Sequence, residues 1–290
     1  MTRERSKAEN DRVFESGFVW NCGGITEWLP ISSTGHMILL NEFVTLEVSP
    51  EFWEMFLVVI QLGAILAVVL LFWKRIWPFG RSAHPVGKTG FLFWCKRDIW
   101  VMWFKIVAAC IPAAVVGLLF DEFFESLFYN PVCVAVALIV FGVGFIWIEN
   151  RNKNMRVKVR ALNDITYRTA FIIGMFQLIA AIFPGTSRSG ATILGALLIG
   201  VSRTVAAEFT FFLAIPVMLG ASLLKVVKFG FSFTGEEMMI LVTGMVTAFL
   251  VSVAVIRFLM GYIKKHDFKV FGWYRIVLGL VVLAYFMVLG

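Results

Sequence analysis

Charged residues are scarce in this sequence. Of its 290 residues only 16% are Asp, Glu, Lys or Arg, whereas 60% are hydrophobic and 30 are Phe. Soluble globular proteins carry about 25% charged residues. So few charges do not make a water-facing surface, which argues against a soluble enzyme, a nucleic-acid-binding protein and a disordered chain. The composition predicts a polytopic membrane protein with no nucleic acid as partner.

Cysteine and histidine are also few. The four cysteines are scattered, with no Cys-x-x-Cys spacing, and the three histidines form no adjacent pair. Disulfide frameworks and zinc sites need such clusters. The sequence therefore predicts neither a disulfide framework nor a metal cluster of this kind.

Long apolar runs are what the sequence has instead. Six of them approach or exceed the roughly 20 residues needed to cross a bilayer: Met55–Trp73, Ile99–Phe120, Pro131–Ile148, Thr204–Leu224, Met238–Ile256 and Val270–Gly290. Two further stretches, Phe14–Phe43 and Ile165–Val201, are interrupted by Pro, Gly, Ser and Thr. We predict an all-α membrane protein in one domain, 1–290, with six transmembrane helices plus two re-entrant helical hairpins.

The loops between these runs alternate in charge. Lys and Arg concentrate in 74–97 and 151–168, whereas Asp and Glu lie in 42–51, 121–125 and 236–237. Because basic loops stay in the cytoplasm, this pattern predicts that both termini face outside, and it accounts for the net charge of +7. The charged first seventeen residues do not fit a cleavable signal peptide.

The two interrupted stretches resemble each other. Leu29–Gly35 (LPISSTG) matches Phe183–Gly190 (FPGTSRSG), and their prolines are 154 positions apart. Three predicted spans separate them, so the second copy would be inserted upside down. This predicts inverted repeats at about 14–149 and 165–290, with the two hairpin tips meeting near the bilayer centre. Two kinked helices without a site are the alternative.

The first tip, Glu27–His36 (EWLPISSTGH), carries a carboxylate, three hydroxyls and an imidazole in a segment otherwise suited to lipid. Ionisable groups at membrane depth are costly and usually functional. Small residues that only let helices approach closely would not explain Glu27 and His36. We predict a nucleophile (Ser33 or Ser32), a general acid or base (His36) and a carboxylate (Glu27).

The second tip, Pro184–Thr192 (PGTSRSGAT), predicts an anion site. Glycine and hydroxyl residues at a helix start expose N–H donors, and Arg188 adds a planar guanidinium that matches phosphate oxygens. Pairing of Arg188 with Glu27 or Glu208 as pure structure is the alternative, and Glu208 with Arg203 fits an ordinary local ion pair. Together the tips predict phosphoryl transfer on a phosphate with a lipid tail.

These motifs, followed by GVSRTVAAEF at Gly200–Phe209, resemble the undecaprenyl pyrophosphate phosphatase (bacitracin-resistance) family from about Gly24 onward. The resemblance implies a multi-pass enzyme of the bacterial plasma membrane, with its site open toward the outer face. The enzyme would remove a phosphate from a polyprenyl diphosphate lipid and so recycle the lipid carrier for cell-wall synthesis. Bacitracin would compete for the same lipid. A lipid-phosphate transporter or flippase is the alternative, and a structural membrane subunit is a weaker one.

The resemblance and the chemistry of the tips together give the expected site. The expected catalytic residues are Glu27, Ser33, His36 and Arg188, and the expected substrate-binding residues are Ser32, Thr34, Gly185, Ser187, Ser189 and Thr192. The resemblance also implies a divalent cation, Mg²⁺ or Ca²⁺, for which Glu27 is the candidate ligand. Attack by Ser33 or by water, and a monomer or a homo-oligomer, stay open.

The front of the chain departs from the pattern of the family. The family has a second glutamate four residues before Glu27, where this chain has Gly23. Read one base forward, the codons from Trp20 to Gly24 can encode Gly-Ile-Val-Glu. We hypothesise that residues 1–23 are an out-of-frame translation, with a genuinely diverged N-terminus as the alternative.

We predict that the chain as given is poorly active or inactive. A cation shared by two carboxylates would lose one ligand at Gly23. Without its entry helix the first tip would also lose its fixed geometry, and small misplacements of reacting groups lower the rate about a hundredfold. Restoring the shifted frame, with Glu in place of Gly23, should recover hydrolysis of a polyprenyl diphosphate at matched membrane levels. Full activity of the chain as given would show that neither feature is needed.

Overall fold

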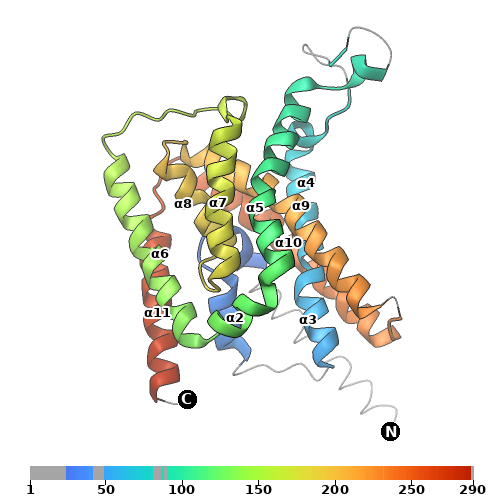
Figure 1. The fold of residues 1–290 in the computed structure, drawn as a ribbon, viewed down its shortest axis with the longest axis vertical. Coiled ribbons are helices and arrows are strands. Elements are labelled where there is room, and N and C mark those ends of the chain that lie inside the picture. Colours follow the sequence, from blue (N-terminus) through green and yellow to red (C-terminus); the bar gives the residue numbers. More distant parts are fainter. Residues whose placement is uncertain (1–23, 42–48, 81–85, 88–90, 231, 289–290) are drawn as a thin grey trace.

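The named elements of the structure are all helical. The structure, a computed structural model, describes residues 24–41, 49–80, 86–87, 91–230 and 232–288 (Figure 1). In chain order the elements are α2 (Ser33–Asn41), α3 (Pro50–Val59), α4 (Gln61–Ile76), η1 (Phe91–Trp94), α5 (Arg97–Phe128), α6 (Pro131–Asn152), η2 (Leu162–Asp164), α7 (Tyr167–Ile182), α8 (Arg188–Leu198), α9 (Arg203–Phe229), α10 (Gly235–Tyr262) and α11 (Lys269–Val288). The predicted all-α fold is confirmed.

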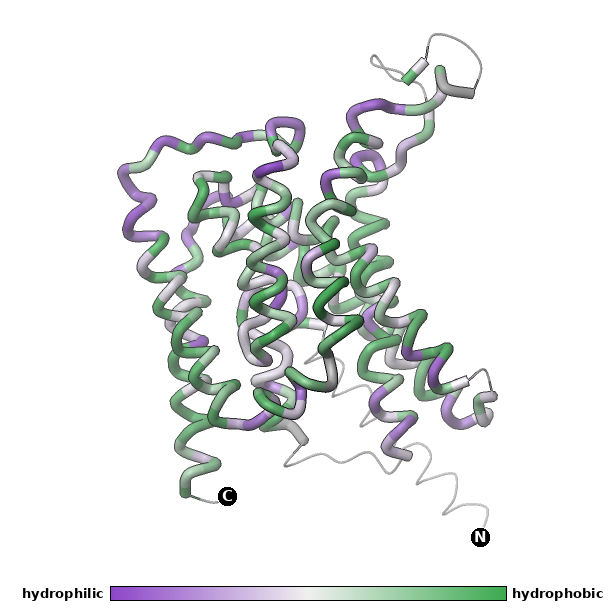
Figure 2. Tube along the Cα trace, in the orientation of Figure 1, coloured by the Kyte–Doolittle hydropathy of each residue, from purple (hydrophilic) through white to green (hydrophobic). Residues whose placement is uncertain are grey.

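Six segments are long and apolar enough to cross a membrane. They are α3 joined to α4, the part of α5 up to Phe120, and α6, α9, α10 and α11. They coincide with the six runs expected from the sequence, so that prediction is confirmed. Figure 2 shows hydrophobic residues along the helices and hydrophilic residues gathered toward the two ends of the bundle.

The charged connections lie at opposite ends of the bundle. Figure 1 shows the α4–α5 and α6–α7 connections at one end, and the α5–α6 and α9–α10 connections at the other, together with the C-terminal end of α11. The first end carries Lys and Arg and is called the basic end below; the second carries Asp and Glu and is called the acidic end. This separation is the asymmetry that the sequence predicts.

Glycines bring α6 and α11 into close contact. A Cβ atom on Gly142 would lie 2.7 Å from the carbonyl oxygen of Gly272, and one on Gly272 would lie 2.8 Å from that of Gly142. Membrane helices approach this closely where small residues face each other. The crossing fixes α11 near its start, one turn before two residues that matter for the site, Tyr274 and Arg275.

The helices α7 and α8 form a hairpin against the other helices. They have 16 and 11 residues, pack on each other, and are joined by a turn between the two ends of the bundle (Figure 1). In the first interrupted stretch, residues 24–28 are helical, a turn follows, and α2 begins at Ser33. The part of that stretch before residue 24, including Gly23, lies outside the described residues.

Two ion pairs near the basic end differ from the expectation. Arg203 pairs with Glu149 of α6, with Nε 2.9 Å from Oε1, whereas Glu208 pairs with Arg75 of α4. The expected pair between Glu208 and Arg203 is therefore wrong. Residues five apart on a helix point about 140° away from each other, so each side chain reaches a different neighbouring helix.

Candidate functional site

A serine with a left-handed backbone turns the chain at the first tip. Ser32 has φ +73° and is fully buried. Its Oγ accepts a hydrogen bond of 3.4 Å from the N–H of Gly35, and α2 begins at the next residue, Ser33. The Ser32 hydroxyl thus caps α2, which leaves Ser33 as the serine that faces the site.

A second serine does the same at the other tip. Ser187 has φ +68°, and its Oγ accepts a hydrogen bond of 3.2 Å from the N–H of Gly190. The helix α8 begins at the next residue, Arg188. Each tip therefore ends in a strained serine cap and a helix start, and a helix start directs N–H donors toward an anion.

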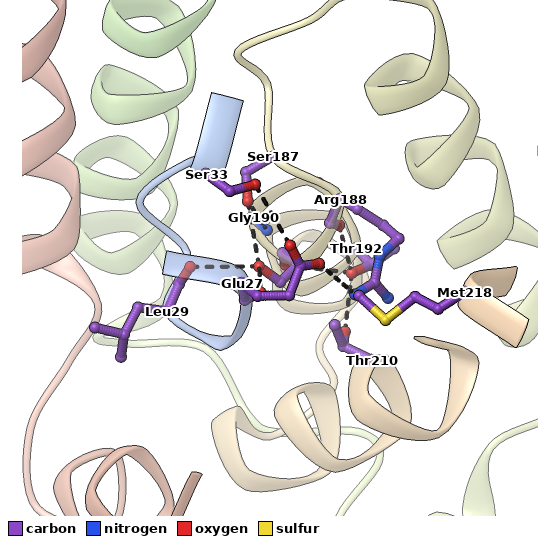
Figure 3. A network of polar contacts seen from close by, with 10 residues as sticks. Glu27, Leu29, Ser33, Ser187, Arg188, Gly190, Thr192, Thr210 and Met218 are labelled. Carbon is purple, nitrogen blue, oxygen red and sulfur yellow. Dashed lines mark hydrogen bonds and ion pairs between the residues drawn. The ribbon is translucent and has the colours of Figure 1, made fainter. Parts of the chain in front are cut away.

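The carboxylate of Glu27 connects the two tips (Figure 3). Arg188 Nη2 donates to Glu27 Oε1 over 3.0 Å, and Ser33 Oγ donates to Glu27 Oε2 over 3.4 Å. Ser189 Oγ donates to the backbone oxygens of Glu27 and Leu29, over 3.1 and 3.4 Å. The structure thus brings together four of the expected site residues from both tips.

The pair of Glu27 and Arg188 leaves part of the guanidinium unused. The two side chains are 14% and 15% exposed. Arg188 Nη1 is buried and has no hydrogen-bond partner among the described residues. A buried donor without a partner costs about 1–3 kcal/mol. An anion bound beside Arg188 would satisfy it, so the ion pair and the expected anion site are compatible.

Two of the expected substrate-binding residues, Thr192 and Gly185, make hydrogen bonds that hold the second tip in place. Thr192 Oγ1 donates to the backbone oxygens of Arg188 and Ser189, over 2.9 and 3.2 Å, and accepts from Thr210 Oγ1 over 2.9 Å. The carbonyl oxygen of Gly185 accepts from Arg275. A threonine inside a helix readily bonds back to the preceding turn, which turns its hydroxyl away from an outside ligand.

His36 makes its hydrogen bonds to groups outside this network. Its Nδ1 is 2.7 Å from the backbone oxygen of Ser32, so Nδ1 carries the proton, and its Nε2 is 2.7 Å from Tyr274 Oη. A carbonyl only accepts hydrogen bonds, which fixes this assignment. Among the described residues Ser33 donates to the carboxylate of Glu27, while His36 bonds to Tyr274 on α11.

A pocket of about 180 Å³ adjoins the first tip. Glu27, Ser33 and Thr34 form a polar wall. The apolar wall consists of Met37, Leu57, Ile60, Ala64 and Ala248. One polar and one apolar wall suit an amphiphile, whose charged group and hydrocarbon chain need different surroundings.

Two further polar residues of this pocket escaped the sequence analysis. Gln61 begins α4 at the break in the first span, and Tyr129 follows α5. Tyr129 is half exposed, but partial desolvation of its hydroxyl, and to a smaller extent the carboxylate of Glu125, raise its pKa above the ordinary value. The phenol therefore remains a hydrogen-bond donor at neutral pH. Both residues could have been found in the sequence as polar residues inside or beside an apolar run. The same signal marks Arg275 in the last apolar run.

The described residues offer a divalent cation few protein ligands. No three side chains of His, Cys, Asp or Glu cluster within that part of the chain. At the tips the only carboxylate is that of Glu27, with the hydroxyl of Ser33 beside it. Mg²⁺ is commonly held by one or two carboxylates plus substrate phosphate oxygens. Glu27 fits that kind of shared site, but not a site made by the protein alone.

Fold and site together define a class of protein: a polytopic membrane protein with an internal ion pair, between Glu27 and Arg188, beside a pocket that has one polar and one apolar wall. The family model of bacitracin resistance protein BacA matches residues 22–281, and the chain belongs to this family. The resemblance noted in the two tips is thereby confirmed.

Named relatives match along nearly the whole chain. The chain is 66% identical over 274 residues to an undecaprenyl-diphosphatase of Desulfitobacterium hafniense, covering 94% of this chain and 96% of that protein. It is 58% identical over 280 residues to undecaprenyl-diphosphatase 1 of Clostridium acetobutylicum, covering 97% and 99%. With an undecaprenyl-diphosphatase of Enterococcus faecalis the identity is 60% over 263 residues, covering 90% and 92%.

The unused half of the Arg188 guanidinium leads to a prediction. Arg188→Lys should lose phosphatase turnover nearly as severely as Arg188→Ala, by about a hundredfold or more. Lysine keeps the charge but lacks the planar fork that binds Glu27 and a phosphate oxygen together. Phosphate release from a polyprenyl diphosphate measures this. Arg151→Lys, near the basic end, is the matched control and should be unaffected; near-normal turnover of Arg188→Lys would show that charge alone suffices.

Proposed function

We propose that this protein is an undecaprenyl-diphosphatase. It hydrolyses undecaprenyl diphosphate to undecaprenyl phosphate and orthophosphate, which recycles the lipid carrier for cell-wall synthesis and confers bacitracin resistance. The observation that carries the proposal is the arrangement of Ser33, Glu27 and Arg188, in which Ser33 and Glu27 line a pocket with an apolar wall and Arg188 pairs with Glu27. The family and the names of relatives at 58–66% identity support the same activity.

The proposed location is the bacterial plasma membrane, with the basic end in the cytoplasm. The positive-inside rule supports this orientation. Tyr129, on the α5–α6 connection at the acidic end, is one of the pocket residues. The pocket would then open toward the outer face, where the protein would compete with bacitracin for the same lipid diphosphate.

Each residue at the tips has a separate role in hydrolysis. Ser33 Oγ attacks the terminal phosphorus, its proton passes to Glu27, and the bond from that phosphorus to the bridging oxygen breaks. Undecaprenyl phosphate leaves. Water then attacks the phosphorus of the phosphoserine and the bond from phosphorus to Ser33 Oγ breaks. Glu27 returns its proton to Ser33 Oγ, and orthophosphate leaves with both hydrogens of the water. Arg188 and the N–H groups at the starts of α2 and α8 stabilise the charge on the equatorial oxygens.

A divalent cation is part of the proposal. Mg²⁺ or Ca²⁺ would be held by the carboxylate of Glu27 and by oxygens of the diphosphate, and it would neutralise charge on the leaving phosphate. The support is the position of Glu27 on the polar wall of the pocket. In the absence of substrate, Arg188 supplies the positive charge next to this carboxylate.

Transport of a lipid phosphate is the rival function, because hairpins and broken helices also occur in transporters. Transport requires an anion site but no nucleophile. The hydrogen bond from Ser33 to Glu27 has a use in phosphoryl transfer and none in transport. The relatives are also named as phosphatases.

Release of orthophosphate by the purified protein in detergent tests the function, since detergent leaves no membrane to transport across. Ser33→Ala and Glu27→Gln should each lower release from undecaprenyl diphosphate by about a hundredfold or more. Ser126→Ala is the matched control, because Ser126 is exposed near the end of α5 and bonds only to the oxygen of Phe123. A folded protein that releases no phosphate, yet moves the lipid across vesicles, would support the transporter instead.

A further inference from the structure

A buried arginine lies directly behind the two tips. Arg275, in the second turn of α11, has no exposed side-chain surface. Among the described residues no carboxylate lies within ion-pair distance of it. Removing a guanidinium from water costs several kcal/mol unless its donors are satisfied. A buried guanidinium therefore needs hydrogen-bond acceptors, and the position of these acceptors indicates which parts of the structure it holds together.

The acceptors of Arg275 are backbone oxygens from both tips. Nη1 donates to Pro30 over 3.2 Å, and Nη2 donates to Gly185 over 3.0 Å and to Thr186 over 2.6 Å. Pro30 belongs to the first tip, and the other two residues belong to the second. One rigid fork on a third element thus connects turns that are far apart in the sequence.

The surrounding packing is shaped to admit this side chain. A Cβ atom on Gly190 would lie 2.6 Å from Arg275 Nη1, so a larger residue in the first turn of α8 would displace the guanidinium. The ring of Phe141 on α6 lies 5.6 Å from the Arg275 Cζ atom, within cation–π range. The guanidinium is therefore confined between α6, α8 and the two turns.

The bonded carbonyls come just before the two strained caps. Thr186 precedes Ser187, and Pro30 lies two residues before Ser32, and both serines have a positive φ. Strained backbone persists only where its surroundings hold it. The residues that follow the caps are Ser33 and Arg188, so the position of the reacting groups depends on the two turns that Arg275 holds.

We propose that Arg275 is a positioning residue of the phosphatase reaction. It holds the two tips at the separation at which Ser33, Glu27 and Arg188 act on one phosphate. The inference rests on the proposed function for its effect on turnover, but the clamping of the tips is a property of the fold.

Steady-state kinetics of Arg275→Met in detergent test the effect on the reaction. We expect kcat to fall about a hundredfold, because small misplacements of reacting groups cost that much, while KM changes less than about threefold because Arg188 remains. A folded variant with kcat within about threefold of the parent would overturn the proposal. So would a loss of kcat that only follows the fraction of folded protein.

Arg275→Lys keeps the proposal testable if Arg275→Met does not fold. Lysine retains the charge but not the planar fork that reaches both turns, so kcat should still fall about tenfold or more. Arg203→Lys is the matched control, because it makes the same substitution in the ion pair with Glu149 near the basic end. It should leave kcat unchanged. Equal effects of the two lysine variants would overturn a specific role for Arg275.

Backbone hydrogen exchange tests the clamp without any turnover. In both Arg275 variants, amides of residues 28–36 and 183–192 should exchange at least about tenfold faster, while amides of 240–256 on α10 stay as in the parent. Unchanged exchange in the tips, or faster exchange everywhere, would overturn the proposal. If the protein with the shifted frame restored also releases no phosphate, the proposed function fails, yet the exchange result still decides whether Arg275 holds the tips.

Discussion

The ion pair between Glu27 and Arg188 is the interaction on which the site depends. It joins residues 161 positions apart, one from each tip, inside a bundle of apolar helices. Each charge would be costly there alone. Paired, they place a carboxylate next to Ser33 and leave one amino group of the guanidinium without a partner among the described residues. A single contact thus brings the proposed base, the proposed nucleophile and the proposed anion site to the same place.

The strain at the tips is offset by the helices around them. Ser32 and Ser187 both adopt a positive φ, a conformation that non-glycine residues rarely hold. Hydrogen bonds from Arg275 and Ser189 hold the adjacent turns, and the close crossing of α6 and α11 fixes the element that carries Arg275. The polar groups of the site are therefore preorganised before a ligand arrives.

The sequence predicted those features that depend on neighbouring residues. Length and hydropathy were enough for the six spans, and the two tips were visible as polar interruptions of apolar runs. The pair of Arg188 and Glu27 was foreseen as an alternative. Other partners across the bundle were not predictable, because the rotation of each helix decides them. Arg203 therefore pairs with Glu149, and Glu208 pairs with Arg75. For the same reason Thr192 donates to the backbone oxygen of Arg188, and His36 bonds to Tyr274. The single charge inside the last apolar run, Arg275, was the overlooked signal.

The most direct test of this account is a density map of the protein bound to undecaprenyl methylenediphosphonate, which cannot be hydrolysed. The account predicts the terminal phosphonate within hydrogen-bond distance of Arg188 Nη1 and Ser33 Oγ, with the hydrocarbon chain along the apolar wall at Leu57 and Ile60. Density for the diphosphonate in the basic-end cavity lined by Lys74 and Arg160, with the two tips empty, would contradict it.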